Sequence, residues 1–155
     1  MNPKYKIELL AEGPKAQIYT IRNLDSEISE FERFADEEDV RYDPGFQEIL
    51  ARIDDMANRL GCIDSFFRNE SARDNAICAL FAPDGKLRLY CIKMRFTLLI
   101  IGGGGIKNTR TYQEDPHLDS CVTLLEDFWK RFALYEDNGE IEISSDGKIT
   151  GKDKI

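Results

Sequence analysis

The hydrophobic pattern of residues 43–61 gives the clearest helical signal in the chain. Asp43 and Pro44 provide an N-terminal cap and a first helical residue whose missing N–H costs nothing. Apolar residues then recur at intervals of three and four, which places them on one face of a helix, and Gly61 supplies a stop. These apolar positions are Phe46, Ile49, Leu50, Ile53, Met56, Ala57 and Leu60. The pattern predicts an amphipathic helix that packs along one side.

Two further helices are predicted, one on each side of this segment in the sequence. Residues 23–26 are Asn-Leu-Asp-Ser, whose polar side chains can cap free backbone amides, so the earlier helix is expected to begin there and to end in an acidic loop at 36–39. Pro116 and Asp119 introduce the later helix. The apolar positions at helical spacing are Leu24, Ile28, Phe31 and Phe34 in the earlier helix, and Leu118, Val122, Leu125, Phe128, Trp129 and Phe132 in the later one.

Four segments have the pattern of β-strands. Residues 16–21 alternate in a β-branched and aromatic run, and three more strands are expected at 76–81, 87–94 and 96–101. Short turns separate the last three, which predicts an antiparallel meander. The run 96–101 is apolar on both faces and is therefore expected to be central. The glycines at 102–105 are expected to end it, and residues 62–75 are expected to be irregular.

The predicted order of elements is β-α-α-β-β-β-α, which favours an α+β fold: an antiparallel sheet with two N-terminal helices packed on one face. A length of 155 residues predicts a single domain. Within it we distinguish a core at 16–115, a C-terminal helix at 116–135, and a small hairpin or flexible tail at 136–155. In the hairpin, Ile141 and Ile143 would lie opposite Ile149.

Composition is typical of a globular protein, with 42% hydrophobic and 32% charged residues. The longest apolar run is much shorter than the roughly 20 residues of a membrane span, and the N-terminal residues lack the pattern of a secretion signal. Four scattered cysteines without a Cys-x-x-Cys pair indicate reduced thiols and a cytoplasmic location. They are Cys62, Cys78, Cys91 and Cys121.

Charge is distributed unevenly along the chain. The net charge is −8, which argues against general attraction to nucleic acid. Residues 25–39 contain eight acidic residues and one arginine, whereas residues 86–110 contain six basic residues and no acidic one. The basic stretch predicts a local anion site on the sheet. The alternative is that these bases are solvated or pair with acids of the early helices.

The glycine run and the single histidine match no established catalytic motif. Lys107 follows Ile106 rather than glycine, and Asn108 replaces the Ser or Thr of a phosphate-binding loop. The glycines are instead expected to allow close approach of another backbone or a ligand phosphate, or to form a structural bulge. His117 is interpreted as a polar residue at a helix start, since no other histidine is present to complete a metal site. We expect neither a metal nor a cofactor.

The strand Leu-Arg-Leu-Tyr-Cys-Ile at 87–92, the apolar strand and glycines that follow, and the segment Lys-Asn-Thr-Arg-Thr-Tyr at 107–112 resemble the sheet of RelE/HigB-type toxins of toxin–antitoxin systems. The order β-α-α-β-β-β is similar too, over residues 16–115. The resemblance implies an RNA endonuclease that cuts messenger RNA, often on the ribosome, without a metal. In that chemistry a ribose 2′-OH attacks the adjacent phosphate, and basic side chains stabilise the charge that develops.

The resemblance also implies roles for individual residues. Arg88 would contact the scissile phosphate, Lys107 and Arg110 would neutralise the transition state, and Tyr112 would act as acid/base or as a stacking group. Further phosphate contacts are assigned to four other bases: Arg68, Arg73, Lys93 and Arg95. The implied partners are an antitoxin protein and messenger RNA or the ribosome, with neither a membrane nor direct DNA binding expected.

A second function is compatible with the same resemblance. Nucleases of this family are small and strongly basic, whereas this chain is longer and acidic. The fold is also used by ParE-type toxins, which inhibit gyrase by protein contact. The alternative is therefore a non-catalytic interaction module of the same fold, with its acidic early helices docking on a basic partner.

Overall fold

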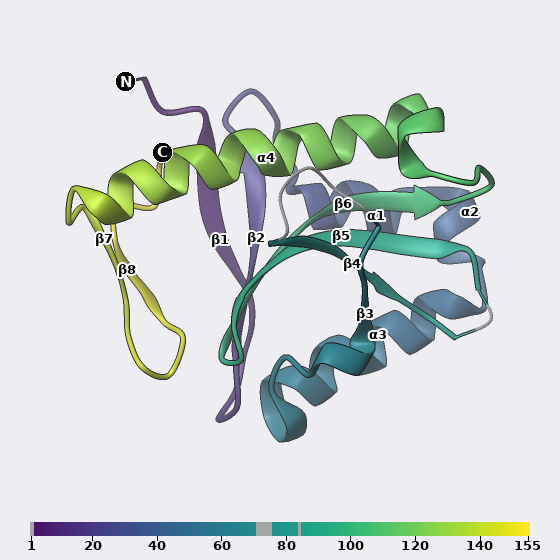
Figure 1. Ribbon diagram of the computed structural model, residues 1–155, viewed down its shortest axis with the longest axis horizontal. Helices are drawn as coiled ribbons and strands as arrows, with labels where there is room; N and C mark the ends of the chain where they lie inside the picture. The colour runs from purple at the N-terminus through teal and green to yellow at the C-terminus, as the bar shows by residue number, and fades with distance from the viewer. Residues whose placement is uncertain (1, 71–75, 84) are drawn as a thin grey trace.

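The computed structural model, which describes residues 2–70, 76–83 and 85–155, contains one six-stranded sheet with helices on both faces (Figure 1). The strand order is β1-β2-β6-β5-β4-β3, and neighbouring strands are antiparallel except β2 and β6, which are parallel. The predicted α+β class and the predicted meander β4-β5-β6 are therefore confirmed, whereas the prediction of an antiparallel sheet is wrong for the pair β2 and β6, which is parallel. The strands are β1 (Tyr5–Glu12), β2 (Gln17–Asn23), β3 (Phe67–Arg68), β4 (Ile77–Phe81), β5 (Leu87–Arg95) and β6 (Leu98–Ile106).

The early helices cover one face of the sheet, as predicted. They are α1 (Glu30–Asp36), α2 (Glu38–Arg41) and α3 (Gly45–Asp55), and the last continues as the π-helical segment Met56–Leu60. Their buried residues, such as Phe34, Val40 and Ile49, pack against Ile18 and Leu99 of the sheet. Gly61 ends the helical stretch at the predicted place, with a positive φ of 73° that favours glycine.

Helix α4 (Pro116–Asp137) crosses the opposite face of the sheet (Figure 1). Asp115 caps it by accepting hydrogen bonds from the amides of His117 (2.9 Å) and Leu118 (3.2 Å). The apolar stripe predicted from the sequence packs against residues of β2, β5 and β6, including Ile21 and Ile100. The sheet is thus buried on both faces, which explains why β6 is apolar throughout.

Both chain termini contribute to the edge of the sheet beside β2. Strand β1 was not predicted, although Tyr5 and Ile7 alternate with charged residues and are buried as the pattern of a half-covered strand requires. The chain end lies against β1, where the backbone amide of Tyr5 donates to the carbonyl of Ile155 (2.8 Å). The predicted C-terminal hairpin is present as β7 (Ile141–Ile143) and β8 (Ile149–Gly151).

The predicted start of the first helix at residues 23–26 is wrong. There the chain forms a turn, with the amide of Ser26 donating to the carbonyl of Asn23 (2.9 Å). The helix begins six residues later than Leu24, where the Ser29 side chain accepts from the amide of Glu32 (3.1 Å) and serves as the cap. The acidic stretch 36–39, predicted to be a loop, contributes to α1 and α2.

The prediction that the glycines at 102–105 end the strand is also wrong, because they lie within β6. The pairing of Leu89 with Gly104 and of Cys91 with Ile101 places one extra residue in β6, which is a β-bulge. A side chain at Gly104 would collide with the carbonyl oxygen of Arg88, and one at Gly102 would lie 3.0 Å from Leu125 of α4. The glycines therefore allow a neighbouring backbone and a helix to approach β6 closely.

A hydrogen bond between Tyr5 and Asp127 joins β1 to α4 and predicts a pH-dependent contribution to stability. The Tyr5 hydroxyl donates to Asp127 Oδ2 (2.6 Å), and this bond is the main cause of a pKa of Asp127 below its usual value. A carboxyl with a depressed folded-state pKa stabilises the fold above its unfolded pKa of about 3.9, and that contribution is lost as the pH falls.

We therefore expect Tyr5→Phe to lower the free energy of unfolding by about 1 kcal/mol at pH 7, since the carboxylate is partly exposed and screened. The loss should shrink as the pH falls below about 4. Urea denaturation at pH 7 and pH 3 measures it. The control is Tyr19→Phe, whose hydroxyl accepts from the amide of Ile149 and involves no carboxylate. A loss for Tyr5→Phe that is the same at both pH values would contradict the assignment.

Candidate anion-binding site

Arg88 lies at the start of β5 with its side chain buried at the end of the sheet. Its Nη1 donates to the carbonyl oxygens of Gly85 (3.1 Å) and Leu87 (3.0 Å), which fixes the plane of the guanidinium. Its Nε donates to Glu70 Oε1 at 2.8 Å. A guanidinium held in this way keeps a defined direction for an anionic partner.

Lys107, which follows β6, reaches the same carboxylate. Its Nζ lies 2.8 Å from Glu70 Oε2, and its backbone amide is held by the carbonyl of Lys86 (2.8 Å). The two basic groups therefore bind the two oxygens of one carboxylate, whose side chain is only 7% exposed. Arg88 and Lys107, 19 positions apart in the sequence, are thus brought to the same acidic side chain.

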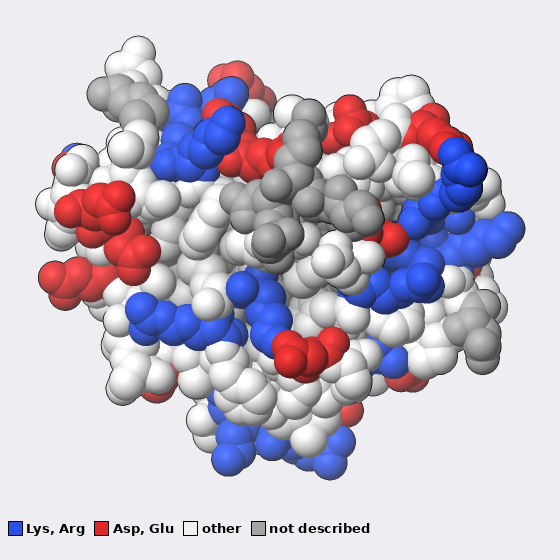
Figure 2. Space-filling view, in the orientation of Figure 1, with Lys and Arg blue, Asp and Glu red and all other residues white. Residues whose placement is uncertain are grey.

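Two more arginines stand close to this site around the ring of Phe81. The guanidinium carbons of Arg52, Arg68 and Arg88 lie 5.0, 5.5 and 6.0 Å from the centre of that ring, within cation–π range. In Figure 2, Lys and Arg side chains gather at the end of the sheet where β5 begins and β6 ends. We call Arg52, Arg68, Arg88 and Lys107 the basic cluster.

Two further residues predicted to bind substrate, Lys93 and Arg95, lie elsewhere. Lys93 and Arg95 are at the far end of β5, roughly 15–25 Å along the strand from Arg88 at about 3.4 Å per residue. Lys93 forms an ion pair with Asp64 and lies 5.6 Å from the ring of Phe67. The prediction for Arg73 lies outside the described residues.

The two remaining residues predicted to be catalytic have opposite environments. The Arg110 side chain is 89% exposed and lies 3.7 Å from Glu114, so it is free to move toward a ligand. Tyr112 is fully buried and packs edge-on against Tyr90, with ring centres 5.8 Å apart. In this conformation the Tyr112 hydroxyl faces the core and is not presented to a substrate.

Sequence reasoning missed three residues of the site: Glu70, Arg52 and Phe81. Glu70 belongs to a segment predicted to be irregular, and its contacts span 18 and 37 positions. Arg52 lies among the apolar positions of the α3 stripe, which was a usable signal, and the structure buries it with Glu48 Oε1 3.5 Å from its Nε. Its Nη1 donates to the carbonyl of Phe66 at 3.4 Å.

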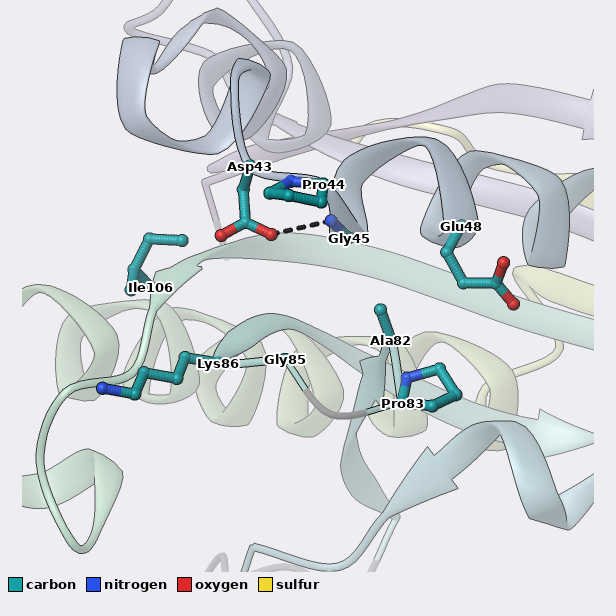
Figure 3. A pocket seen from close by; sticks show the side chains of 9 residues that line it. All are labelled: Asp43, Pro44, Gly45, Glu48, Ala82, Pro83, Gly85, Lys86 and Ile106. Atoms are coloured by element: carbon teal, nitrogen blue, oxygen red, sulfur yellow. Dashed lines mark hydrogen bonds between the residues drawn. The ribbon is translucent and has the colours of Figure 1, made fainter.

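A cavity of about 670 Å³ lies on the other face of the sheet, between the start of α3 and the β4–β5 turn (Figure 3). The carboxylates of Asp43 and Glu48 and the ammonium of Lys86 contribute to its lining. Asp43 accepts from the amide of Gly45 (2.8 Å), as the close-up shows. With two carboxylates and one ammonium, this cavity is less suited to an anion than the basic cluster.

His117 lies in the first turn of α4 beside a cavity of about 220 Å³. Its Nε2 is 2.9 Å from the carbonyl oxygen of Gly104 and 3.2 Å from Glu37 Oε1, which connects α4 to β6 and to the end of α1. Burial raises the pKa of Glu37, while His117 acts in the opposite direction. Within the described residues, no group of three or more His, Cys, Asp or Glu side chains is placed to hold a metal ion.

Comparison of the chain with protein-family models, with curated proteins and with solved structures finds no match. None of the helices in the described part of the chain is long and apolar enough to cross a membrane. The functional argument therefore rests on the chemistry of the basic cluster.

Proposed function

We propose that this protein is an RNA endonuclease of the RelE/HigB type, the toxin component of a toxin–antitoxin system. The observation that carries the proposal is the contact of Arg88 and Lys107 with the two oxygens of Glu70, each at 2.8 Å. A phosphodiester presents two non-bridging oxygens with a single negative charge, much as a carboxylate does. RNA would displace Glu70 and place its scissile phosphate between the two bases.

The proposed reaction is transfer of the phosphoryl group to a neighbouring hydroxyl. The ribose 2′-oxygen attacks phosphorus and releases its proton to water, the bond from phosphorus to the 5′-oxygen breaks, and a 2′,3′-cyclic phosphate forms. Arg88 stabilises the added negative charge from a fixed position, which costs no reorganisation during the reaction. Lys107 supplies the second charge and is the group best placed to give a proton to the leaving 5′-oxygen.

Two exposed arginines near the basic cluster favour an anion with several phosphates in a row, such as RNA. Arg110 extends into solvent from the segment after Lys107, and Arg68 lies on the other side of Arg88 near Phe81. Phosphates on either side of the scissile one would contact these two side chains. The chain also contains a strand, helices and three strands in succession, as the resemblance implies, although β1, β3 and a third early helix are additional to that order.

The net charge of −8 limits how this protein can bind RNA. An acidic protein is repelled by bulk RNA, including the RNA surface of the ribosome, so substrate binding is local and requires a partner that delivers the RNA. The proposed antitoxin would be a protein that covers the basic cluster with its own carboxylates. No metal is required in the proposed reaction, because the bases supply the neutralising charge.

The experiment is incubation of the purified protein with messenger RNA, with and without ribosomes, followed by analysis of the new RNA ends. Attack by the 2′-oxygen predicts a 2′,3′-cyclic phosphate on the upstream fragment and a 5′-hydroxyl on the downstream fragment. RNA carrying 2′-O-methyl groups should remain intact. Fragments with 5′-phosphate ends, or the absence of cleavage in both arms, would contradict the proposal.

One observation favours the alternative of a non-catalytic interaction module. Arg88 and Lys107 are already paired with Glu70, and Tyr112 is buried, so these groups are also explained as parts of the core. Helices α1 and α2 expose four carboxylates toward solvent: Glu32, Asp36, Glu38 and Asp39. Under this alternative the RNA assay is negative, and a basic partner protein is released when these acids are replaced by Gln and Asn.

A further inference from the structure

Cys78 of β4 and Cys91 of β5 face each other across the strand pair on the side of the sheet covered by α3. They are direct partners in the register, and their sulfur atoms are 3.9 Å apart, close enough for either thiol to donate to the other. Both are free thiols. No function has been assigned to this pair above, and it lies outside the basic cluster.

The backbone geometry at this position suits a disulfide. Residues directly opposite in an antiparallel pair have Cα atoms about 4.5 or 5.5 Å apart, and disulfides span about 4.4–6.8 Å. The strands therefore already hold the two cysteines at a bonding separation. Rotation of the side chains is sufficient to bring the sulfur atoms from 3.9 Å to the bond length of about 2.05 Å.

The two thiols differ in reactivity. Cys78 is partly exposed, and the hydrogen bond from Cys91 lowers its pKa, with help from the ammonium of Lys93. Cys91 is fully buried, and burial raises its pKa well above the usual value. Cys78 thus has the properties of an attacking thiolate, and Cys91 those of a resolving thiol.

We propose that Cys78 and Cys91 are a redox-active pair that hydroperoxides convert to a disulfide between β4 and β5. The Cys78 sulfur attacks one peroxide oxygen, the O–O bond breaks, and Cys78 becomes a sulfenic acid while the other oxygen leaves as water or alcohol. The Cys91 sulfur then attacks the Cys78 sulfur, loses its proton, and displaces water. Two thiols and one hydroperoxide thus yield a disulfide, one water, and one further water or alcohol, and a dithiol reductant reverses the change.

The other two cysteines are expected to remain thiols. Burial raises the pKa of both Cys62 and Cys121 to about 12, so neither forms a thiolate at neutral pH. Cys121 belongs to α4 on the opposite face of the sheet, where His117 Nε2 lies 3.9 Å from its sulfur. Oxidation should therefore be selective for the Cys78–Cys91 pair.

The test treats the folded protein with hydrogen peroxide at low molar excess and follows intact mass, alkylation of the unfolded product and peptide mapping. We expect a loss of about 2 Da, alkylation of two cysteines instead of four, a Cys78–Cys91 peptide, and full reversal by dithiothreitol. Cys91→Ser should stop at a sulfenic acid that dimedone traps at Cys78. Cys78→Ser should show neither product, and Cys121→Ser should behave as wild type.

Three results would overturn the proposal: a disulfide that contains Cys62, equal oxidation of all four thiols, or loss of 2 Da in the Cys91→Ser variant. Circular dichroism of each variant before oxidation shows whether it is folded. Because the readout is mass and not RNA cleavage, a negative result here leaves the proposed nuclease function unaffected. Formation of the Cys78–Cys91 disulfide would likewise neither support nor contradict the nuclease function.

Discussion

Replacing Arg88 by alanine is expected to lower the rate of RNA cleavage by about 10²–10³-fold. This is the usual effect of removing one pre-positioned donor from a group that carries developing negative charge. The Arg88 guanidinium is held in a fixed direction by two backbone carbonyls, and alanine has no group that could donate from that position. The measurement is the single-turnover rate with saturating enzyme, with the RNA ends analysed as above.

The controls separate loss of the charged donor from loss of the fold. Arg59→Ala removes an exposed arginine paired with Asp55 on the far part of the α3 stretch and should cleave as wild type. Arg88→Lys keeps a buried positive charge but not the fixed fork, and we expect an intermediate rate. If the wild type cleaves and Arg88→Ala cleaves equally well, the assignment of this site is wrong.

The exposed Arg110 should act through binding and not through the chemical step. Because its side chain is held only loosely, 3.7 Å from Glu114, its loss costs little stability. A double variant with Arg88→Ala and Arg110→Ala should therefore be about as stable as Arg88→Ala alone. A cleavage rate unchanged at saturation, with weaker RNA binding at low salt and a shallower dependence of binding on salt, is the behaviour expected when a phosphate contact is lost.

Local patterns in the sequence predicted much of the fold. The stripe of α3, the stop at Gly61 and the meander β4-β5-β6 depend on residues within a few positions of one another, so periodicity and turn chemistry were enough. The edge strand β1 was missed although Tyr5 and Ile7 alternate with charged residues. The alternating pattern from which β1 could have been predicted was therefore present in the sequence.

Other features depend on contacts that no local pattern contains. The parallel pairing of β2 with β6 joins segments about 80 positions apart. Glycine is a poor strand former, and its place in β6 is explained only by the carbonyl of Arg88 and the side chain of Leu125 beside it. The basic segment was predicted from charge alone, whereas the acid that holds it, Glu70, lies in a stretch without regular structure.

The contacts of Glu70 also show which acidic residue pairs with the basic segment of the sequence. Arg88 and Lys107 share one buried carboxylate and do not pair with the acids of the early helices, as the alternative to an anion site had suggested. Glu70 therefore has two effects. It stabilises two buried cations in the free protein, and it competes with any anion that approaches them.

Glu70→Gln should separate these two effects. The amide keeps the shape of the side chain but leaves Arg88 and Lys107, whose side chains are 8% and 12% exposed, without a counter-charge. Removing one partner from a buried ion pair typically costs about 3–5 kcal/mol, so we expect a loss of this size in the free energy of unfolding at low salt. Urea denaturation in a buffer without phosphate or sulfate measures it.

Inorganic phosphate should then restore much of what Glu70→Gln loses, because an anion that binds only the folded state raises its stability, by about 2.7 kcal/mol at 100 times its dissociation constant. The wild type, whose site is filled by Glu70, should respond far less. Asp55→Asn is the matched control, since it removes a partly exposed carboxylate 3.0 Å from Arg59, outside the basic cluster, and it should cost less than about 1 kcal/mol without a specific phosphate response. Equal stabilisation of all three proteins by phosphate would mean that Glu70 occupies no anion site, and the basis for placing a scissile phosphate between Arg88 and Lys107 would be lost.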